Sequence, residues 1–115
     1  MITYKLVMPE HLNKFGDLFG GNMLKWVDEV AAMAVFIDFP EARFLTIGMD
    51  QVVFKRPVKS GAILKFVITP LKEGHTSVTY SVSVVEPNCY DNPYFTTSVT
   101  FVRVDDQMRK IPVRS

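Results

Sequence analysis

One segment of helical periodicity stands among sequence that otherwise has the character of β-strands, and this contrast constrains the fold of the 115-residue chain. The predicted helix begins near Gly20 or Gly21 and runs to about Ile37. Pro40 prevents it from continuing, because proline lacks a backbone N–H and clashes with the preceding turn. Apolar residues spaced three and four apart predict one buried helix face. This stripe consists of Leu24, Val27, Ala31, Ala34 and Val35.

The segments on both sides of the helix predict strands. Residues 2–8 form a short apolar strand that ends at Pro9, and residues 9–19 form a loop. Four more strands are predicted after the helix, at residues 43–55, 62–71, 76–86 and 94–104. The third of these alternates most regularly, with Val78, Tyr80, Val82 and Val84 on one face and Thr79, Ser81 and Ser83 on the other. We expect the polar tail from Asp105 to be loosely ordered.

This order of elements predicts a single α+β domain over residues 1–115. A helix followed by four strands with short turns favours an antiparallel meander packed around that helix. The length is sufficient for one domain with one core.

Composition and charge give no indication of several classes of partner. The formal net charge is +1, so bulk electrostatics favour neither a nucleic acid nor an acidic membrane. The longest apolar stretch, residues 30–37, is too short to span a bilayer, and no signal peptide is evident. Cys89 is the one cysteine, which excludes an intramolecular disulfide. His11 and His75 lack the spacing of metal ligands, so no metal site is predicted. We therefore expect a cytoplasmic protein.

Asp28 is the anomalous residue of the predicted helix, because it lies at the edge of the apolar stripe. In one interpretation it is a solvated side chain that pairs with Lys25, while Lys25 and Glu29 pair at i,i+4 spacing. In the other, the carboxylate is held beside an apolar pocket as a general base or a nucleophile. The sequence pattern leaves both interpretations open.

The double glycine at the start of the helix permits two interpretations as well. Gly20 and Gly21 would leave unpaired backbone N–H groups at the positive end of the helix dipole, where a polarised carbonyl oxygen can bind. Alternatively, the glycines allow tight packing of the helix against a strand.

Residues 8–31, M-P-E-H-L-N-K-F-G-D-L-F-G-G-N-M-L-K-W-V-D-E-V-A, resemble the signature of the hot-dog-fold acyl-CoA thioesterases. The resemblance is greatest to the YciA-type bacterial acyl-CoA hydrolases, which are related to the brain acyl-CoA hydrolases. A second block, residues 46–58 with Gly61, is similar to the second strand of that family and its exit turn. The resemblance implies a five-stranded antiparallel sheet wrapped around one long central helix.

The same resemblance implies roles for individual residues. Asp28 matches the family's catalytic carboxylate, and Asn13 matches an amide that polarises the thioester or places water, often across a subunit interface. Gly20 and Gly21 match the helix terminus that donates a backbone N–H to the thioester oxygen. The implied reaction is hydrolysis of an acyl-CoA to a free acid and CoA, with no cofactor, since CoA is part of the substrate. The implied assembly is at least a homodimer, and a trimer of such dimers is common in this branch.

Cationic residues are predicted to contact the phosphates of CoA. Lys55, Arg56 and Lys59 cluster after the second strand, and Thr76 and Ser77 supply hydroxyl donors after a glycine turn. The alternative for each is an ordinary solvated turn residue. Four residues are candidates for the acyl end by side-chain type alone, with a place in the core as the alternative. They are Met23, Trp26, Phe36 and Phe54.

Two other functions remain open from the sequence. A hot-dog dehydratase or hydratase uses a histidine with a carboxylate as acid and base, and neither His11 nor His75 lies in such a motif. A non-catalytic acyl-CoA-binding module is the second alternative.

Overall fold

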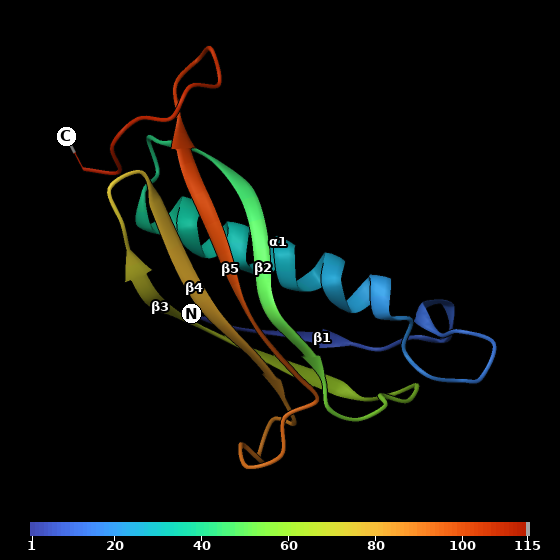
Figure 1. Ribbon diagram of the computed structural model, residues 1–115. Helices are drawn as coiled ribbons and strands as arrows, with labels where there is room; N and C mark the ends of the chain where they lie inside the picture. The colour runs from blue at the N-terminus through green and yellow to red at the C-terminus, as the bar shows by residue number, and fades with distance from the viewer. Residues whose placement is uncertain (115) are drawn as a thin grey trace.

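The computed structural model describes residues 1–114 and contains every predicted helix and strand (Figure 1). The helix begins at Gly20, as predicted, and continues one residue beyond Ile37. The loop before the helix contains a short 3₁₀ turn, η1, at Pro9–His11. The remaining elements are β1 (Ile2–Leu6), α1 (Gly20–Asp38), β2 (Arg43–Phe54), β3 (Ile63–Glu73), β4 (Ser77–Val85) and β5 (Phe95–Val104).

The five strands form one antiparallel sheet in the order β1-β3-β4-β5-β2, which curves around α1 (Figure 1). The α+β class and the wrapped helix are therefore confirmed. The predicted four-strand meander is wrong at one place, because β2 pairs with β5 instead of β3. The alternation of residues along a strand indicates which face is buried, but it does not specify which strand lies beside it. In the structure, β2 forms an edge of the sheet next to β5.

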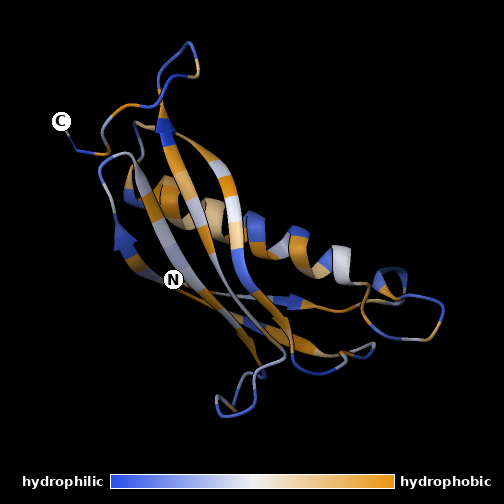
Figure 2. Ribbon diagram, viewed as in Figure 1, coloured by the Kyte–Doolittle hydropathy of each residue, from blue (hydrophilic) through white to orange (hydrophobic). Residues whose placement is uncertain are grey.

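The core lies between α1 and the concave face of the sheet. On β4, Val78, Tyr80, Val82 and Val84 are buried, as their alternation predicted. Figure 2 shows hydrophobic residues on the helix and along the strands around it, with hydrophilic residues concentrated in the loops. The buried residues of the helix are Met23, Trp26, Val27, Val30, Ala31, Ala34 and Val35. Leu24, the remaining member of the predicted stripe, packs against this core from a partly buried position.

β2 departs from regular pairing at two points along β5. The register shifts between Thr46 and Gly48 and again between Asp50 and Val53. Gln51, within the second irregularity, has a φ of 54°, which lies in the left-handed region. Irregularities of this kind bend a strand and increase its twist, so they help β2 follow the curvature of the sheet over the helix.

The C-terminal segment is anchored, so the expectation of a loose tail is wrong. Val113 is only 3% exposed and belongs to the core. Its backbone N–H donates to the His75 carbonyl at 2.8 Å, and its carbonyl accepts from Arg103 Nη1 at 3.0 Å. Arg114 pairs with Glu73 at 3.0 Å. The buried Val113 and the contacts of its neighbours therefore hold in place a segment that is mostly polar in composition.

Within residues 1–114, no helix combines the length and the apolar content needed to cross a membrane.

Candidate active site

Asp28 lies half-buried on α1, facing β2. Its Oδ1 atom accepts a hydrogen bond of 2.8 Å from Thr46 Oγ1. No ion pair between Asp28 and Lys25, or between Lys25 and Glu29, occurs among the described residues. The predicted ion pairs are therefore absent, and a hydroxyl from a neighbouring strand orients the carboxylate instead.

Thr46 is the site residue that sequence reasoning missed. It lies on β2, eighteen positions after Asp28, and immediately precedes the first irregularity in the pairing of that strand. A hydroxyl in a strand sequence is unremarkable by itself. Only the packing of β2 beside α1 brings Thr46 to the carboxylate, so position within the second family-like block was its sole sequence signal.

The start of α1 presents free backbone donors. Phe19 is the N-cap and offers no side-chain hydrogen bond, and its carbonyl accepts from Asn22 N at 3.0 Å. The N–H groups of Gly20 and Gly21 have no acceptor within residues 1–114. These donors lie at the positive end of the helix dipole, where an oxygen that gains negative charge is stabilised.

Two aromatic rings border this helix start. A Cβ added to Gly20 would lie 3.5 Å from Phe54 Cζ, and one added to Gly21 would lie 2.7 Å from Phe19 Cε1. The second distance is too short for a real contact, so a side chain at position 21 would force the exposed ring of Phe19 to shift. The rings of Phe19 and Phe54, both about half exposed, therefore border the terminus.

Asn13 closes the loop that precedes the helix. Its Oδ1 accepts hydrogen bonds from Phe15 N at 2.9 Å and from Asp17 N at 3.2 Å. Asp28 lies eight residues beyond Gly20, which corresponds to about 12 Å along a helix axis. No hydrogen bond joins the side chains of Asn13 and Asp28 in the part of the chain that the structure describes. One chain by itself does not bring the predicted amide to the carboxylate.

A cavity of about 330 Å³ adjoins the start of α1. Its walls come from the end of the loop before the helix, the first turn of α1, the exit of β2 and the entry to β5. It is lined by Leu18, Met23, Phe54, Lys55, Arg56, Pro57, Val58 and Tyr94. The cavity thus places two of the cations predicted to contact CoA beside the first turn of α1.

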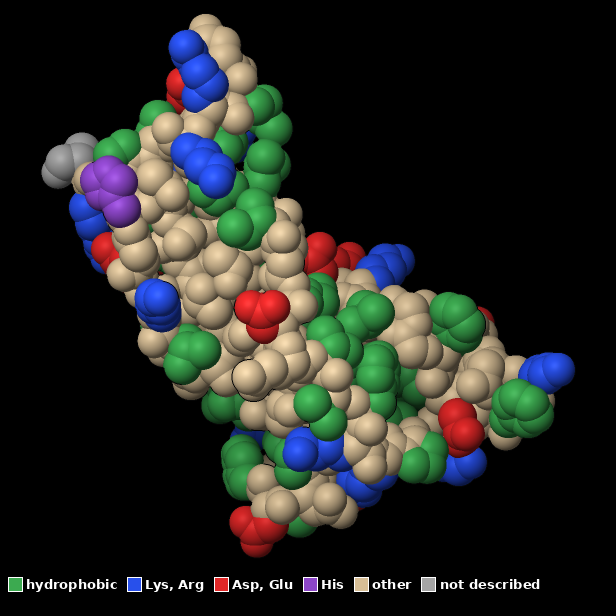
Figure 3. Space-filling model, viewed as in Figure 1, with side chains coloured by type: hydrophobic (Ala, Val, Ile, Leu, Met, Phe, Trp, Pro, Cys, Tyr) green, Lys and Arg blue, Asp and Glu red, His purple; other side chains and the backbone are tan. Residues whose placement is uncertain are grey.

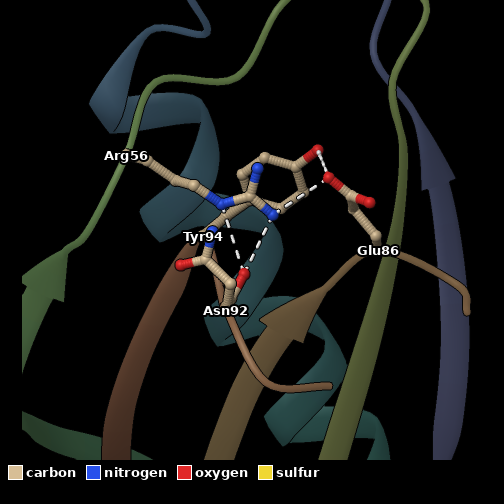
Figure 4. Close-up of polar contacts among 4 residues, drawn as sticks. All are labelled: Arg56, Glu86, Asn92 and Tyr94. Carbon is tan, nitrogen blue, oxygen red and sulfur yellow. Dashed lines mark hydrogen bonds and ion pairs between the residues drawn. The ribbon is translucent and has the colours of Figure 1, made fainter. Parts of the chain in front are cut away.

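The three predicted cations lie in different surroundings. Lys55 is exposed and its side chain has no partner among the described residues. Lys59 forms an ion pair with Asp17. Arg56 is held in a cluster of protein groups, as Figure 4 shows, and its partly buried side chain, 26% exposed, forms an ion pair with Glu86.

Thr76 and Ser77 lie at the turn between β3 and β4, at the opposite end of the sheet from Lys55. β3 separates the two ends and has 11 residues, which corresponds to about 36 Å of strand. The carbonyl of Thr76 accepts from Arg103 N at 2.9 Å. The structure therefore does not bring these hydroxyls to the lysines within one chain.

The four candidates for the acyl end divide into two pairs. Met23 and Trp26 are core residues, 2% and 5% exposed. Phe36 and Phe54 are about half exposed. Of the two exposed candidates, Phe54 borders the helix terminus, because its ring lies beside Gly20.

The fold and the match to a family model define a thioesterase. The family model of the thioesterase superfamily matches residues 15–90, which is more than half of the chain. The chain therefore belongs to the thioesterase superfamily, and the predicted family and hot-dog fold are confirmed. The assignment of individual residues to roles in the site stays a prediction.

Individual members of the superfamily are similar to this chain in sequence or in structure. The acyl-CoA thioester hydrolase YciA of Salmonella typhimurium is 25% identical over 122 residues, which cover 99% of this chain and 91% of the relative. A hexameric hotdog fold thioesterase of Campylobacter jejuni superposes with a TM-score of 0.82 at 32% identity, covering 96% of this chain and 86% of the other. An acyl-CoA hydrolase of Staphylococcus aureus, solved with butyryl coenzyme A and coenzyme A, gives a TM-score of 0.85 at 27% identity. It covers 97% of this chain and 67% of the other.

Proposed function

We propose that this thioesterase hydrolyses acyl-CoA thioesters to a carboxylic acid and CoA, with Asp28 as the reacting carboxylate. The observation that carries the proposal is the hydrogen bond of 2.8 Å by which Thr46 orients Asp28. The helix that holds Asp28 also begins with glycines whose N–H groups are free. The names of the relatives support acyl-CoA as the substrate class.

In the proposed reaction, the thioester oxygen accepts a hydrogen bond from a glycine N–H at the start of α1 of the second copy, because Gly20 and Asp28 of one helix lie about 12 Å apart. Asp28 takes a proton from water while the water oxygen attacks the carbonyl carbon. The tetrahedral intermediate then expels CoA as a thiolate, which takes up a proton, and the acid remains. A preorganised N–H donor contributes roughly 3 kcal/mol to such a step. In the alternative, Asp28 attacks the carbonyl directly and water hydrolyses the resulting anhydride.

A relative supports the choice of residues. The acyl-CoA hydrolase of Staphylococcus aureus has been solved as separate alanine variants of an asparagine, an aspartate and a threonine. Its asparagine and aspartate are fifteen residues apart, as Asn13 and Asp28 are here. Its threonine follows its aspartate by seventeen residues, close to the eighteen that separate Asp28 and Thr46 in this chain.

The proposed site is completed by a second copy of the chain. β2 is an edge strand that leaves backbone groups unpaired, and such edges associate readily. Figure 3 shows hydrophobic side chains gathered over β2 and the adjoining part of α1. The exposed apolar residues of β2 are Leu45, Ile47, Val52, Val53 and Phe54. Association of two copies along β2 would allow Asn13 of one copy to approach Asp28 of the other.

Larger assembly is part of the same proposal. Relatives from Campylobacter jejuni and Yersinia pestis are hexameric thioesterases. We therefore expect three β2-linked dimers to form a hexamer.

For the coenzyme, Lys55 is the best-placed cation, because its side chain is free and it lines the cavity beside the helix terminus.

A thiol-release assay over a series of acyl-CoA chain lengths tests this function. We expect release of free CoA from at least one acyl-CoA, dependent on Asp28. A hot-dog hydratase would instead add water to an enoyl-CoA and release no thiol. A binding module would bind acyl-CoA without cleaving the thioester. Either result would contradict the proposal.

A further inference from the structure

Arg56 lies at the exit of β2 and its guanidinium is bound by three other protein groups (Figure 4). Nη2 donates to Glu86 Oε1 at 3.1 Å and to the Asn92 carbonyl at 2.9 Å, and Nε donates to the same carbonyl at 3.2 Å. The guanidinium carbon lies 3.8 Å from the centroid of the Tyr94 ring. Arginine forms such stacked and multiply bonded contacts better than lysine, because its planar head presents several N–H groups in a fixed arrangement.

The contacts form a closed cluster. Tyr94 also donates a hydrogen bond of 3.2 Å to Glu86 Oε1, the oxygen that accepts from Arg56. Burial, reinforced by the carboxylate, raises the pKa of the Tyr94 hydroxyl and keeps it protonated as a donor. The charge of Arg56 is compensated by Glu86, and several of its N–H groups are already engaged. This arrangement is poorly suited to an additional coenzyme phosphate.

The cluster also fixes one wall of the cavity at the start of α1. Lys55 N donates to the Tyr94 carbonyl at 2.9 Å, so the β2 exit and the entry to β5 are joined at the stacked tyrosine. Phe54, the next residue back along β2, packs edge-on against Phe95 with ring centroids 4.8 Å apart. The Phe54 ring in turn borders Gly20. A continuous series of contacts therefore leads from Arg56 to the free N–H groups of the helix.

We infer that Arg56 is a positioning residue that holds the cavity wall of Phe54 and Tyr94 against the thioester end of the substrate, and that it does not bind the coenzyme phosphates. The inference rests on the proposed thioesterase function. It separates Arg56 from Lys55, its neighbour in sequence, whose side chain remains free to meet a phosphate.

Two thioester substrates with the same acyl group distinguish the roles. Acyl-CoA carries the nucleotide phosphates, and acyl-pantetheine carries none. For Arg56→Met we expect kcat to fall about tenfold on both substrates, because small displacements of groups at a reacting centre are costly. The ratio of the two rates should stay as in the wild type. Glu86→Gln, which keeps an acceptor of similar shape, should lower kcat on both substrates in the same direction.

Two further variants serve as controls. Lys55→Ala should lower kcat/KM about tenfold for acyl-CoA alone, because a hydrogen bond to a charged group is lost only when a phosphate is present. Arg56→Lys should remain impaired on both substrates, because lysine keeps the charge but lacks the stacked, multiply bonded head. Circular dichroism and the melting temperature establish that each variant is folded. If Arg56→Met does not fold, Glu86→Gln and Arg56→Lys carry the test.

The opposite pattern overturns the inference. A loss in Arg56→Met or Arg56→Lys that is confined to acyl-CoA would make Arg56 a phosphate ligand, as would tighter CoA binding in Glu86→Gln. Calorimetric titration with CoA separates the inference from the proposed function. If the wild type releases no thiol but binds CoA, the proposed function fails and with it the positioning role. Wild-type hydrolysis with equal activity in Arg56→Met would remove the positioning role alone.

Discussion

Thr46 of β2 holds Asp28 of α1 by a hydrogen bond of 2.8 Å between Thr46 Oγ1 and Asp28 Oδ1. This bond occupies one carboxylate oxygen and leaves the other able to accept a proton. It also links the helix to the edge strand of the sheet. The orientation of the proposed reacting group therefore depends on the packing of β2 against α1, and a neighbour on the helix has no part in it.

Replacement of Asp28 by asparagine should remove hydrolysis while the fold persists. The amide oxygen can still accept from Thr46, but it cannot take a proton from water or attack the thioester. We expect kcat to fall by about 10²- to 10⁴-fold, the usual contribution of a general base. Steady-state thiol release measures this, with Glu29→Gln, an exposed neighbour, as the matched control. Comparable loss in both variants would contradict the assignment.

Replacement of Thr46 by valine should affect turnover more than stability. Valine has a similar shape but lacks the hydroxyl, so the carboxylate loses its orienting donor. A hydrogen bond to a charged group is worth about 1.5–3 kcal/mol, and at this partly exposed site we expect the lower end, or about tenfold in kcat. Thr46→Ser restores the donor and should recover most of the activity. Equal rates in the valine and serine variants would show that the hydroxyl is dispensable.

Mixing two inactive variants tests whether the site is shared between copies. If Asp28 acts with Asn13 of a second copy, a mixed dimer of Asp28→Ala and Asn13→Ala contains one site with both residues intact. After denaturation and refolding of an equal mixture, the activity should recover to about a quarter of the wild-type value, because half of the dimers are mixed and each has one working site. Each variant refolded alone is the control. Failure to recover in mixtures shown to contain mixed dimers would place the site within one chain.

Shortening the buried side chain of Val113 should destabilise the whole domain. Val113→Ala removes two methyl groups from a position that is 3% exposed, at an expected cost of about 2 kcal/mol in the free energy of unfolding. Urea unfolding followed by circular dichroism measures the change. Lys110→Ala, an exposed position in the same segment, should unfold like the wild type. A wild-type midpoint in Val113→Ala would indicate that the segment is not part of the folding unit.

Alkaline pH should weaken the fold through Tyr80. Burial, followed by its hydrogen bond of 2.7 Å to Asp38, raises the pKa of the Tyr80 hydroxyl above the ordinary value of 10. The folded chain therefore keeps a proton that the unfolded chain releases. The resulting stability is fully present below pH 10 and is lost as the pH rises above that value, by at most about 1.4 kcal/mol per pH unit for one group.

Unfolding free energies between about pH 9 and about pH 11 test this dependence, because that interval brackets the ordinary tyrosine pKa. Tyr80→Phe should reduce the slope of stability against pH, while Tyr94, whose pKa is also raised, keeps a part of it. Identical slopes in Tyr80→Phe and the wild type would contradict the role of Tyr80.

The local elements could be predicted from sequence because their signals are local. Pro40 and the double glycine delimit α1 to within one residue at each end. Alternation in β4 identified its buried face. The resemblance of residues 8–31 to a known family signature indicated the thioesterase family, which the family comparison confirms.

Other features depend on contacts between distant segments, and these carry no local signal. The sequence alone determined the helix, the strands, the buried faces of α1 and β4, and the family that the chain resembles. Only the tertiary structure decided that β2 pairs with β5, that Thr46 reaches Asp28, and that Arg56 faces Glu86 across 30 positions of sequence. The physical reason is that periodicity records which face of an element avoids water, whereas the choice of hydrogen-bond partner depends on how the sheet closes around the helix.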